Sequence, residues 1–286
     1  MGPLQVTVRG RQRCSAAVGY LRPAMKRPNL TVEIRALAHR VIMDGKRAVG
    51  VEYSQNGGLH RATARREVLL SGGTINSPQL LQLSGVGPGA LLQSLGIPVA
   101  HDLPGVGENL QDHLGGRVIY RCRHANTVNE ISHSWIRQAV TGMQYILAKS
   151  GALMMGAAPI GLFVRTRPEL ESPDVQYQFL AGSSERTGEG MHDFPACTLV
   201  AIPCRPESRG WLRIRSPDPS VPPAMMANYL STQADRDTMV AALRVSRRVF
   251  ASQPMQKLVT EEYLPGKQAV SDDDILDHVR ATGGTT

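Results

Sequence analysis

The chain has 286 residues, of which 42% are apolar and 20% are charged, and its mean hydropathy is -0.19. This composition supplies enough apolar side chains for one large or two ordinary globular domains, and it excludes a disordered or fibrous protein. The net charge of +8 comes from arginines that recur singly or in short pairs, and only 5% of the residues are aromatic, so a solvated basic surface is predicted rather than a nucleic-acid-binding one.

No segment has the length and hydropathy of a membrane-spanning helix. The longest weakly polar stretch, Gly151 to Val164, is interrupted by Pro159 and is shorter than the roughly 18 to 20 residues that cross a bilayer. The first residues, Met1 to Leu4, lack the basic segment and apolar run of a secretory signal. The default expectation is a soluble, cytoplasmic protein, with membrane association left open.

The cysteines and histidines predict neither disulfides nor a metal site. Four widely spaced cysteines are expected to be reduced, structural thiols: Cys14, Cys122, Cys197 and Cys204. There is no H-E-x-x-H motif, and no acidic cluster with ligand spacing lies near His101 or His113. The acidic run from Asp272 to Asp274 is better explained as the start of a capped helix.

Residues 29 to 71 have the pattern of an antiparallel meander that feeds a buried strand. The pattern consists of an alternating strand, two turn signals and a return strand, at residues 30–34, Asp44-Gly45, Asn56-Gly57-Gly58 and residues 48–53. The run from Glu67 to Ser71 is almost continuously apolar, which is typical of a strand that is covered on both faces.

A glycine pair and a short helix follow this run. Ser77 is placed to cap the first turn and Pro78 fits the first helical position, so a helix is predicted over residues 79–83, with a stop at Gly85. The strand, Gly72-Gly73 and the helix start would leave unpaired amide groups and the positive end of the helix dipole beside bare backbone. An anion site is predicted at this position.

A domain boundary is predicted near Leu114-Gly115-Gly116. Beyond it, strand-like runs predict an α+β domain on an antiparallel sheet, and they lie at residues 118–120, 175–180, 199–202 and 211–214. Helical periodicity predicts an amphipathic helix over residues 233–252. A last helix is expected from Ser271, with Asp274 in the capping-box position, to about Ala281.

The chain lacks a convincing dinucleotide fingerprint and a hydrolase nucleophile elbow. Residues 85–90 read G-x-G-x-x-A, but they follow a helical segment and include Pro88, whereas a Rossmann fingerprint leaves a strand and opens a helix. A turn that ends a helix explains them better. No G-x-S-x-G motif occurs, which removes the main hydrolase signal.

The segment from Glu67 to Pro88, EVLLSGGTINSPQLLQLSGVGP, resembles the second signature of the glucose-methanol-choline oxidoreductases. In that signature a small pair is followed by Ser-Pro, two aliphatic residues and Ser-Gly-aliphatic-Gly. Flanking segments resemble the family in order and spacing: CSAAVGYLRPAMKRPNLTV, MDGKRAVGVEY, LPGVGENLQDH, PDVQYQF, RPESRGWLRIRSPDP and HVRATGGTT. The likeness covers essentially the whole chain and is closest to choline dehydrogenase-like alcohol dehydrogenases.

The resemblance implies a mixed α+β and α/β protein. A partial FAD-binding domain of the para-hydroxybenzoate hydroxylase type would be joined to a substrate domain with a six-stranded antiparallel sheet and flanking helices. Residues 1–115 would be the middle part of the FAD-binding domain, residues 116–265 the substrate-binding domain, and residues 266–286 the start of the return to the FAD-binding domain.

The resemblance also implies a set of FAD-binding positions in three groups. These are Leu37, whose backbone would meet the adenine; Gly72, Gly73, Ser77 and Pro78, near the dinucleotide; and Asn109, Asp112 and His113 of the N-L-x-D-H segment, near the cofactor and the domain junction.

The departures from the family pattern concern catalysis. Family members begin with a strand and a G-x-G-x-x-G loop well before the matched region, and their catalytic histidine stands a few residues beyond the position of Thr286. No residue of this sequence inherits the catalytic role, and the chain alone is expected to be an inactive fragment. In the whole enzyme, the resemblance implies oxidation of a primary alcohol to an aldehyde, with hydride passing to flavin N5.

The resemblance says less about the substrate. Choline enzymes of the family use a carboxylate near the segment that reads GAAPIGLFVRT here, and Pro159 stands at that position. Met154-Met155 and Ala157-Ala158 suggest an apolar pocket wall, which favours an uncharged primary alcohol over a quaternary ammonium. The electron acceptor, oxygen or a carrier, is not specified. The alternative hypothesis is a non-catalytic nucleotide- or protein-binding module derived from the family.

Overall fold

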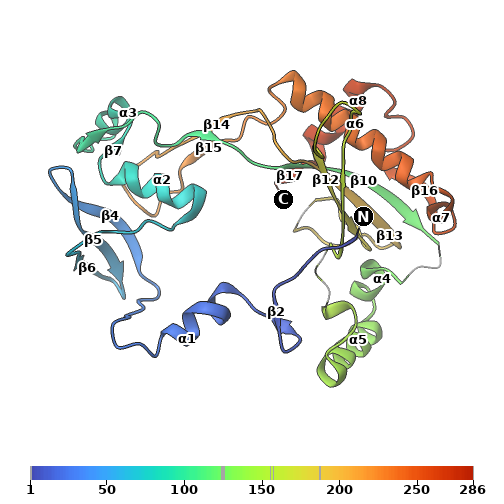
Figure 1. Ribbon diagram of the computed structural model, residues 1–286, viewed down its shortest axis with the longest axis horizontal. Helices are drawn as coiled ribbons and strands as arrows, with labels where there is room; N and C mark the ends of the chain where they lie inside the picture. The colour runs from blue at the N-terminus through green and yellow to red at the C-terminus, as the bar shows by residue number, and fades with distance from the viewer. Residues whose placement is uncertain (1, 124–125, 155, 157, 187, 286) are drawn as a thin grey trace. The chain divides into compact units, whose positions relative to one another are not determined.

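The computed structural model describes residues 2–123, 126–154, 156, 158–186 and 188–285 (Figure 1). The chain divides into two compact units, each built from segments that are distant in sequence. Unit 1 comprises Met1–Ala24, Asp112–Glu207 and Leu230–Thr286, and unit 2 comprises Met25–Gln111 and Ser208–Tyr229. The units therefore alternate along the chain, whereas the sequence-based domains are consecutive ranges.

Unit 1 is built on a seven-stranded antiparallel sheet. Its strands follow the order β1-β11-β12-β13-β10-β16, and β17 also pairs with β10. The bounds are β1 Gly2–Pro3, β10 Leu114–Cys122, β11 Ile160–Val164, β12 Val175–Leu180, β13 Ala196–Pro203, β16 Val259–Leu264 and β17 Gly284–Thr285. Strand β13 is buried along its whole length because it has a neighbour on each edge and contacts helix α6.

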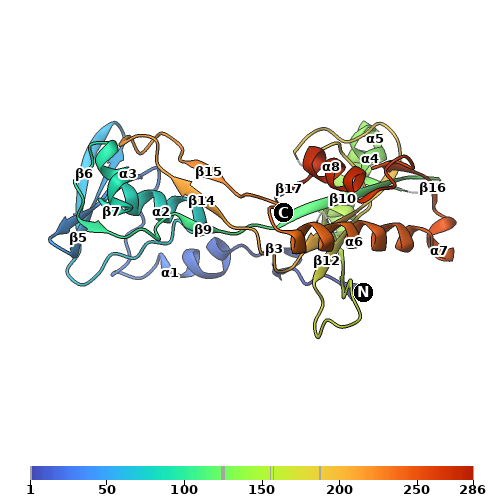
Figure 2. The same ribbon diagram turned by 90° about the horizontal axis from the view of Figure 1, so that it is seen from above.

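Two amphipathic helices supply the rest of the unit 1 core. Helix α6 (Gln233–Phe250) contacts β13 and β10, and α8 (Asp272–Thr282) contacts α6 and β10. Figure 2 shows α6 running beside the sheet, with α8 nearby. The apolar face of α6 is fully buried at Met239, Leu243 and Phe250, each worth about 1.5 to 3 kcal/mol of burial. Both helices predicted from the sequence are confirmed, including the capping box between Ser271 and Asp274.

The remaining elements of unit 1 are one helix of 14 residues, α5, and several shorter elements. They are the hairpin β2 (Val8–Arg9) and β3 (Gln12–Arg13), the π-helix η1 (Ala17–Leu21), α1 (Arg22–Ala24), α4 (Val128–Ser132), α5 (Trp135–Ala148), the 3-10 helix η2 (Ala152–Met154) and α7 (Gln253–Gln256). Among the described residues, no helix is long and apolar enough to cross a membrane.

Unit 2 combines three small sheets with two helices. A meander is formed by β4 (Leu37–Asp44), β5 (Arg47–Gln55) and β6 (Gly58–Thr63); β7 (Val86–Gly87) pairs with β8 (His101–Asp102); and β14 (Gly210–Arg213) lies between β9 (Glu108–Leu110) and β15 (Ala224–Met226). The helices are α2 (Gly73–Leu83) and α3 (Gly89–Ser94). The meander and its turns are confirmed, because Gly45, Asn56 and Gly57 adopt the positive φ angles that a tight turn requires.

Two of the predicted strands do not form, and a third forms but belongs to a different sheet from the one predicted. Residues 30–34 and 67–71 form no strand, and the side chain of Leu69 is 77% exposed. Both runs have strand-like composition, but no backbone within the described residues pairs with them, and a strand needs a partner for its amide and carbonyl groups. The run predicted at residues 211–214 is confirmed as β14, yet it pairs within unit 2 rather than joining the sheet of unit 1.

Candidate cofactor site

A cavity of about 460 Å³ lies in unit 2 beside helix α2. Its walls come from the start of β4, the middle of β5, the extended segment 68–72 and one face of α2. Most of the wall is apolar, with Val51, Leu80 and Leu83 among its residues, while Ser71, Asn76 and Ser77 add polar groups. A flat aromatic ring with a polar edge suits such a lining.

Helix α2 begins earlier than the sequence predicts. Its first residue is Gly73, with Gly72 as the N-cap, so Ser77 is not the capping residue and Pro78 lies inside the helix. Gly73 has a φ of +79°, a conformation that glycine adopts without strain, and this allows the chain to turn into the helix before Ser77 is reached. Pro78 has no N–H, so the helical hydrogen bond back to the carbonyl of Thr74 is missing.

The helix start on which the anion-site prediction depends lies at residues 72–76. Gly72, Gly73 and Thr74 are exposed, and no side chain caps the first turn of α2. An ideal Cβ on Gly73 would meet no atom within 4 Å, so its backbone faces open space. Because Gly72 and Asn76 also line the cavity, free amide groups of a helix start stand beside the apolar wall.

Hydrogen bonds hold the cavity walls in place. The backbone N–H of Val41 in β4 donates to Ser84 Oγ at 2.8 Å, and Ser84 Oγ donates to the carbonyl of Leu80 at 2.5 Å. Gln79, also on the cavity wall, donates from Nε2 to the carbonyl of Val221 at 3.2 Å. The meander, α2 and the loop around residue 221 are therefore fixed to one another.

Gln82 anchors α2 from beneath. Its side chain is fully buried, and its Nε2 donates to the carbonyls of Val106 at 3.0 Å and Leu212 at 3.2 Å. Its Oε1 accepts from the N–H of Ile214 at 2.9 Å. One amide side chain thus satisfies three backbone groups from two distant segments, and these bonds fix the position of α2 against β14.

The structure brings together part of the predicted cofactor-binding set. Leu37, Gly72 and Ser77 line the cavity, and Gly73 and Pro78 adjoin them in α2. The other predicted residues lie outside its walls. Asn109 is an exposed residue of β9 with a φ of +63°, Asp112 belongs to unit 1, and His113, also in unit 1, has its Nε2 3.3 Å from the carbonyl of Cys204.

Several wall residues were not singled out from the sequence. Ala38 and Val51 lie in the predicted meander, and their pairing there with the strand that carries Leu37 could have pointed to this wall. Pro219 has no such signal, because it is distant in sequence from the rest of the cavity and is held there through the loop that Gln79 contacts. The chemistry of the walls, apolar on one side and glycine amides on the other, fits a nucleotide.

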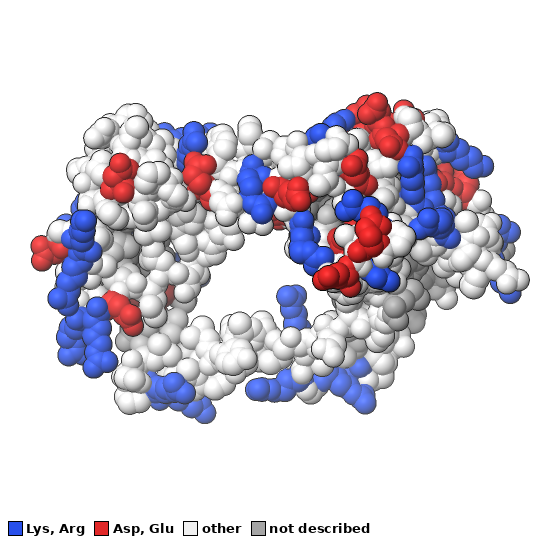
Figure 3. Space-filling model, turned by 45° about the horizontal axis from the view of Figure 1, so that its top comes forward, with Lys and Arg blue, Asp and Glu red and all other residues white. Residues whose placement is uncertain are grey.

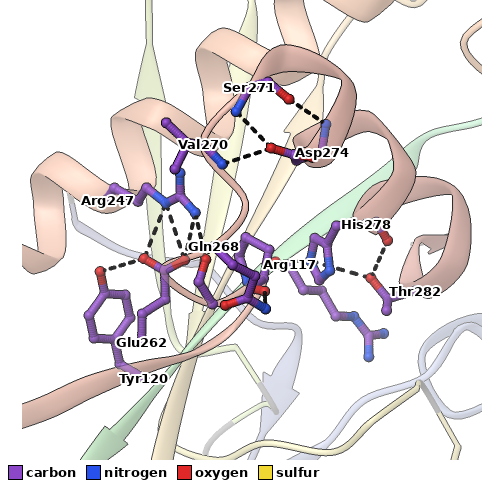
Figure 4. A network of polar contacts seen from close by, with 12 residues as sticks. Arg117, Tyr120, Arg247, Glu262, Gln268, Val270, Ser271, Asp274, His278 and Thr282 are labelled. Atoms are coloured by element: carbon purple, nitrogen blue, oxygen red, sulfur yellow. Dashed lines mark hydrogen bonds and ion pairs between the residues drawn. The ribbon is translucent and has the colours of Figure 1, made fainter.

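A buried polar network in unit 1 is a structural feature rather than a second site (Figure 4). Arg247 of α6 donates to both oxygens of Glu262, and Tyr120 Oη donates to Glu262 Oε2 at 3.0 Å. Burial, followed by the charge of Glu262, raises the pKa of Tyr120 well above its usual value. These groups satisfy one another's hydrogen-bonding capacity across α6, β10 and β16.

Figure 4 also shows His278 of α8. Its ring Nε2 lies 2.8 Å from the carbonyl of Arg117 and 3.4 Å from Thr282 Oγ1, as Figure 4 shows. Desolvation by burial lowers the pKa of His278 below its usual value of 6.5, with the Arg117 carbonyl acting in the opposite direction. Within the described residues, no group of three or more His, Cys, Asp and Glu side chains is arranged to hold a metal ion.

All four cysteines are unpaired in the structure, and their reduced state stays a prediction. Cys122 and Cys197 lie on the paired strands β10 and β13 and share a hydrogen bond, which lowers the pKa of Cys122 and raises that of Cys197. The apolar pocket wall predicted around Met154 falls partly outside the described residues, because Met155 and Ala157 are not among them.

Comparisons with known proteins show which family the chain resembles. The amino-terminal part of the family described as GMC oxidoreductase matches residues 1–115, and its carboxy-terminal part matches residues 206–286. The chain is 39% identical over 280 residues to the mitochondrial choline dehydrogenase of Homo sapiens, covering 98% of this chain and 47% of that protein. It is also 39% identical over 284 residues to an oxygen-dependent choline dehydrogenase of Staphylococcus aureus, covering 99% and 50%.

Solved structures resemble the fold. A formate oxidase from Aspergillus oryzae superposes with a TM-score of 0.88 at 23% identity, covering 98% of this chain and 53% of that one. A pyridoxine 4-oxidase from Mesorbium loti gives a TM-score of 0.79 at 24% identity, covering 97% and 50%. The chain therefore spans about half the length of the relatives that it matches.

Proposed function

Because this chain belongs to the GMC oxidoreductase family, we propose that it forms part of an FAD-dependent oxidoreductase that acts on CH–OH groups. The observation that carries the proposal is the unit 2 cavity, which Leu37, Gly72 and Ser77 all line. The sequence resemblance implies a cofactor-binding role for all three residues.

The roles of the cavity residues follow from their chemistry. Leu37 and the aliphatic residues of the wall would contact a flat ring, and the amides at the start of α2 would donate to phosphate oxygens. FAD, when bound, supplies the hydride acceptor for the oxidation of a primary alcohol to an aldehyde. We assign Asn109, Asp112 and His113 to the same cofactor and the sheet of unit 1 to the substrate, with residues 1–115, 116–265 and 266–286 keeping the domain roles that the resemblance implies.

The proposed substrate is an uncharged primary alcohol. No Asp or Glu occurs between Glu130 and Glu169, a stretch that includes Pro159 and strand β11. A quaternary ammonium group such as that of choline is stabilised by a carboxylate or by an aromatic cage. With the whole protein, kcat/KM for unbranched primary alcohols should therefore exceed kcat/KM for choline, and a preference for choline would contradict this assignment.

Cofactor binding can be measured directly, without turnover. FAD is titrated into the chain and the fluorescence anisotropy of the flavin is followed, with ADP as a competitor for the adenine part. The variant Asn76→Trp places a large side chain on the cavity wall, and it should weaken FAD binding by at least about tenfold. Gln93→Trp is the matched control, because Gln93 is an exposed amide on α3 of the same unit and outside the cavity.

The outcomes separate the possible functions. Loss of binding in Asn76→Trp with wild-type binding in Gln93→Trp supports the cavity as the nucleotide site. Equal binding by both variants contradicts the location of the site. ADP binding without any FAD binding would favour a non-catalytic nucleotide-binding module instead.

A further inference from the structure

The thiols of Cys122 and Cys197 are neighbours on the side of the unit 1 sheet that α6 covers. Strands β10 and β13 pair antiparallel, with Cys197 opposite Tyr120, and the N–H of Cys122 donates to the carbonyl of Pro195 at 2.9 Å. The two cysteines are therefore diagonal neighbours across the strand pair. Both pack in the apolar core that includes the buried face of α6, so their side chains lie on the same face of the sheet.

The two thiols differ in exposure and in ionisation. Cys197 is 4% exposed, whereas Cys122, the last residue of β10, is only partly buried. The hydrogen bond that they share lowers the pKa of Cys122 and raises that of Cys197. A thiol that is accessible and readily ionised is the one that reacts with oxidants, and a neighbouring thiol can then convert the product into a disulfide.

Charged side chains do not account for the ionisation of Cys122. Acidic and basic side chains are interspersed over much of the face shown in Figure 3. Burial and the charge of Glu130 both act against the hydrogen bond from Cys197 and raise the pKa of Cys122. The reactivity of Cys122 thus depends on its contact with the second thiol rather than on a basic environment.

A disulfide between these positions requires the end of β10 to move. Diagonal neighbours of an antiparallel pair have Cα atoms roughly 7 to 8 Å apart, and a disulfide spans about 4.4 to 6.8 Å. The end of β10 can move because Cys122 is its last residue and its pairing with β16 is irregular between Tyr120 and Cys122. A bond closed in this way is strained, so a reductant reopens it readily.

We infer that Cys122 and Cys197 form a reversible, peroxide-sensitive switch in unit 1. The Cys122 thiolate attacks hydrogen peroxide and breaks its O–O bond, so that Cys122 becomes a sulfenic acid and the other oxygen takes up a proton and leaves as water. The sulfur of Cys197 then attacks the sulfur of Cys122, and the sulfenic hydroxyl leaves with the thiol proton of Cys197 as a second water. Two thiols are oxidised to one disulfide, and one hydrogen peroxide is reduced to two waters.

The movement that closes the disulfide should loosen β16. Strand β10 lies between β13 and β16, so drawing its end toward β13 moves that end away from β16. Arg123 holds the end in place, because its N–H donates to the carbonyl of Leu258 at 2.8 Å and its Nη2 donates to the carbonyl of Val259 at 3.1 Å. Oxidation should weaken both contacts.

The test treats the reduced chain with hydrogen peroxide, alkylates the remaining thiols and maps the digest by mass spectrometry without reduction. Alkylation should be lost at least about tenfold faster at Cys122 than at Cys204, which is also partly buried but has a pKa raised by burial. The product should be a disulfide between Cys122 and Cys197 that dithiothreitol reverses. Deuterium exchange of the Arg123 amide should become at least about tenfold faster on oxidation, while that of Val118 in the middle of β10 stays unchanged.

Two substitutions separate the steps. In Cys197→Ala, peroxide should leave Cys122 as a sulfenic acid that dimedone traps, because the second thiol is missing. Cys204→Ala is the matched control and should form the same disulfide at the rate of the unsubstituted chain. Circular dichroism of the reduced variants checks their folding, and the disulfide map of the unsubstituted chain decides the matter if Cys197→Ala does not fold.

Three results would overturn the inference. The first is loss of alkylation at the same rate for Cys122 and Cys204. The second is a disulfide that joins Cys122 to Cys14 or Cys204 instead of Cys197. The third is unchanged exchange of the Arg123 amide after the bond between Cys122 and Cys197 has formed, which would make the disulfide a staple without a conformational effect.

Discussion

Arg247 in α6 and Glu262 in β16 form a two-pronged ion pair that joins the helices of unit 1 to its sheet. Arg247 Nη2 lies 2.8 Å from Glu262 Oε1, and Arg247 Nε lies 3.1 Å from each carboxylate oxygen. The side chain of Glu262 is only 7% exposed and that of Arg247 is 24% exposed. A charge at this depth depends on its partner, since water cannot replace it.

Replacing Arg247 by Met should destabilise unit 1 by about 3 to 5 kcal/mol, because Glu262 would remain buried without its partner. Urea unfolding followed by circular dichroism measures the loss. Arg280→Met serves as the control, because the Arg280–Asp277 pair is exposed and such pairs contribute about 0 to 1 kcal/mol. Equal effects of the two substitutions would show that the buried pair is not a structural link.

Replacing Gln82 by Met should destabilise unit 2 by at least about 3 kcal/mol. The side-chain volume is similar, but the carbonyls of Val106 and Leu212 and the N–H of Ile214 lose their partner, and each unsatisfied group costs about 1 to 3 kcal/mol. Gln93→Met, at an exposed position of α3, should stay within about 0.5 kcal/mol. Thermal unfolding of both variants tests the difference.

Two glycines should respond in opposite directions to alanine. Gly73 has a φ of +79°, so Gly73→Ala should cost about 1 kcal/mol of stability and shift the start of α2. Gly142 lies inside α5 with open space around its Cβ position, so Gly142→Ala should add about 0.5 to 1 kcal/mol. The denaturant midpoints of the two variants, compared with that of the unsubstituted chain, measure both effects. Stabilisation by both substitutions would mean that Gly73 is not held in this conformation.

The stability of unit 1 should decrease in mild acid because of His278. Burial lowers the folded-state pKa of His278 below the unfolded value of 6.5, so the unfolded chain binds a proton more readily. The contribution of this residue is complete above pH 6.5 and is lost as the pH falls through the folded-state pKa. Unfolding free energies measured from about pH 8 to about pH 5 should therefore fall less steeply in His278→Gln. Identical slopes would exclude His278 as the group responsible.

The elements that the sequence predicted correctly are those that carry their own local signal. The helices over residues 233–252 and 271–281 have apolar periodicity, and the second has a capping box as well. The runs at residues 30–34 and 67–71 have the composition of strands but lack a partner strand, which no local pattern reveals. Strand β14 was recognised, but its place in unit 2 depends on pairing with β9, about 100 residues earlier.

The candidate site divides along the same line. The motif positions of Leu37, Gly72 and Ser77 predicted cofactor binding, and these three residues line one cavity. The capping role of Ser77 was wrong because a glycine with positive φ starts the helix sooner than the serine-proline pair. The position of Pro219 on the cavity wall could not be predicted from the sequence, because it depends on hydrogen bonds between distant segments.

The alternation of the two units along the chain sets an order for their completion during synthesis. The last segment of unit 2 in this chain ends at Tyr229, whereas α6, β16 and α8 of unit 1 come afterwards. Until then, the central strand β13 has no helix to cover it, and its apolar side chains are open to aggregation. A ribosome that stops between Tyr229 and Gln233 would therefore release a chain whose strand β13 lacks the helix that covers it.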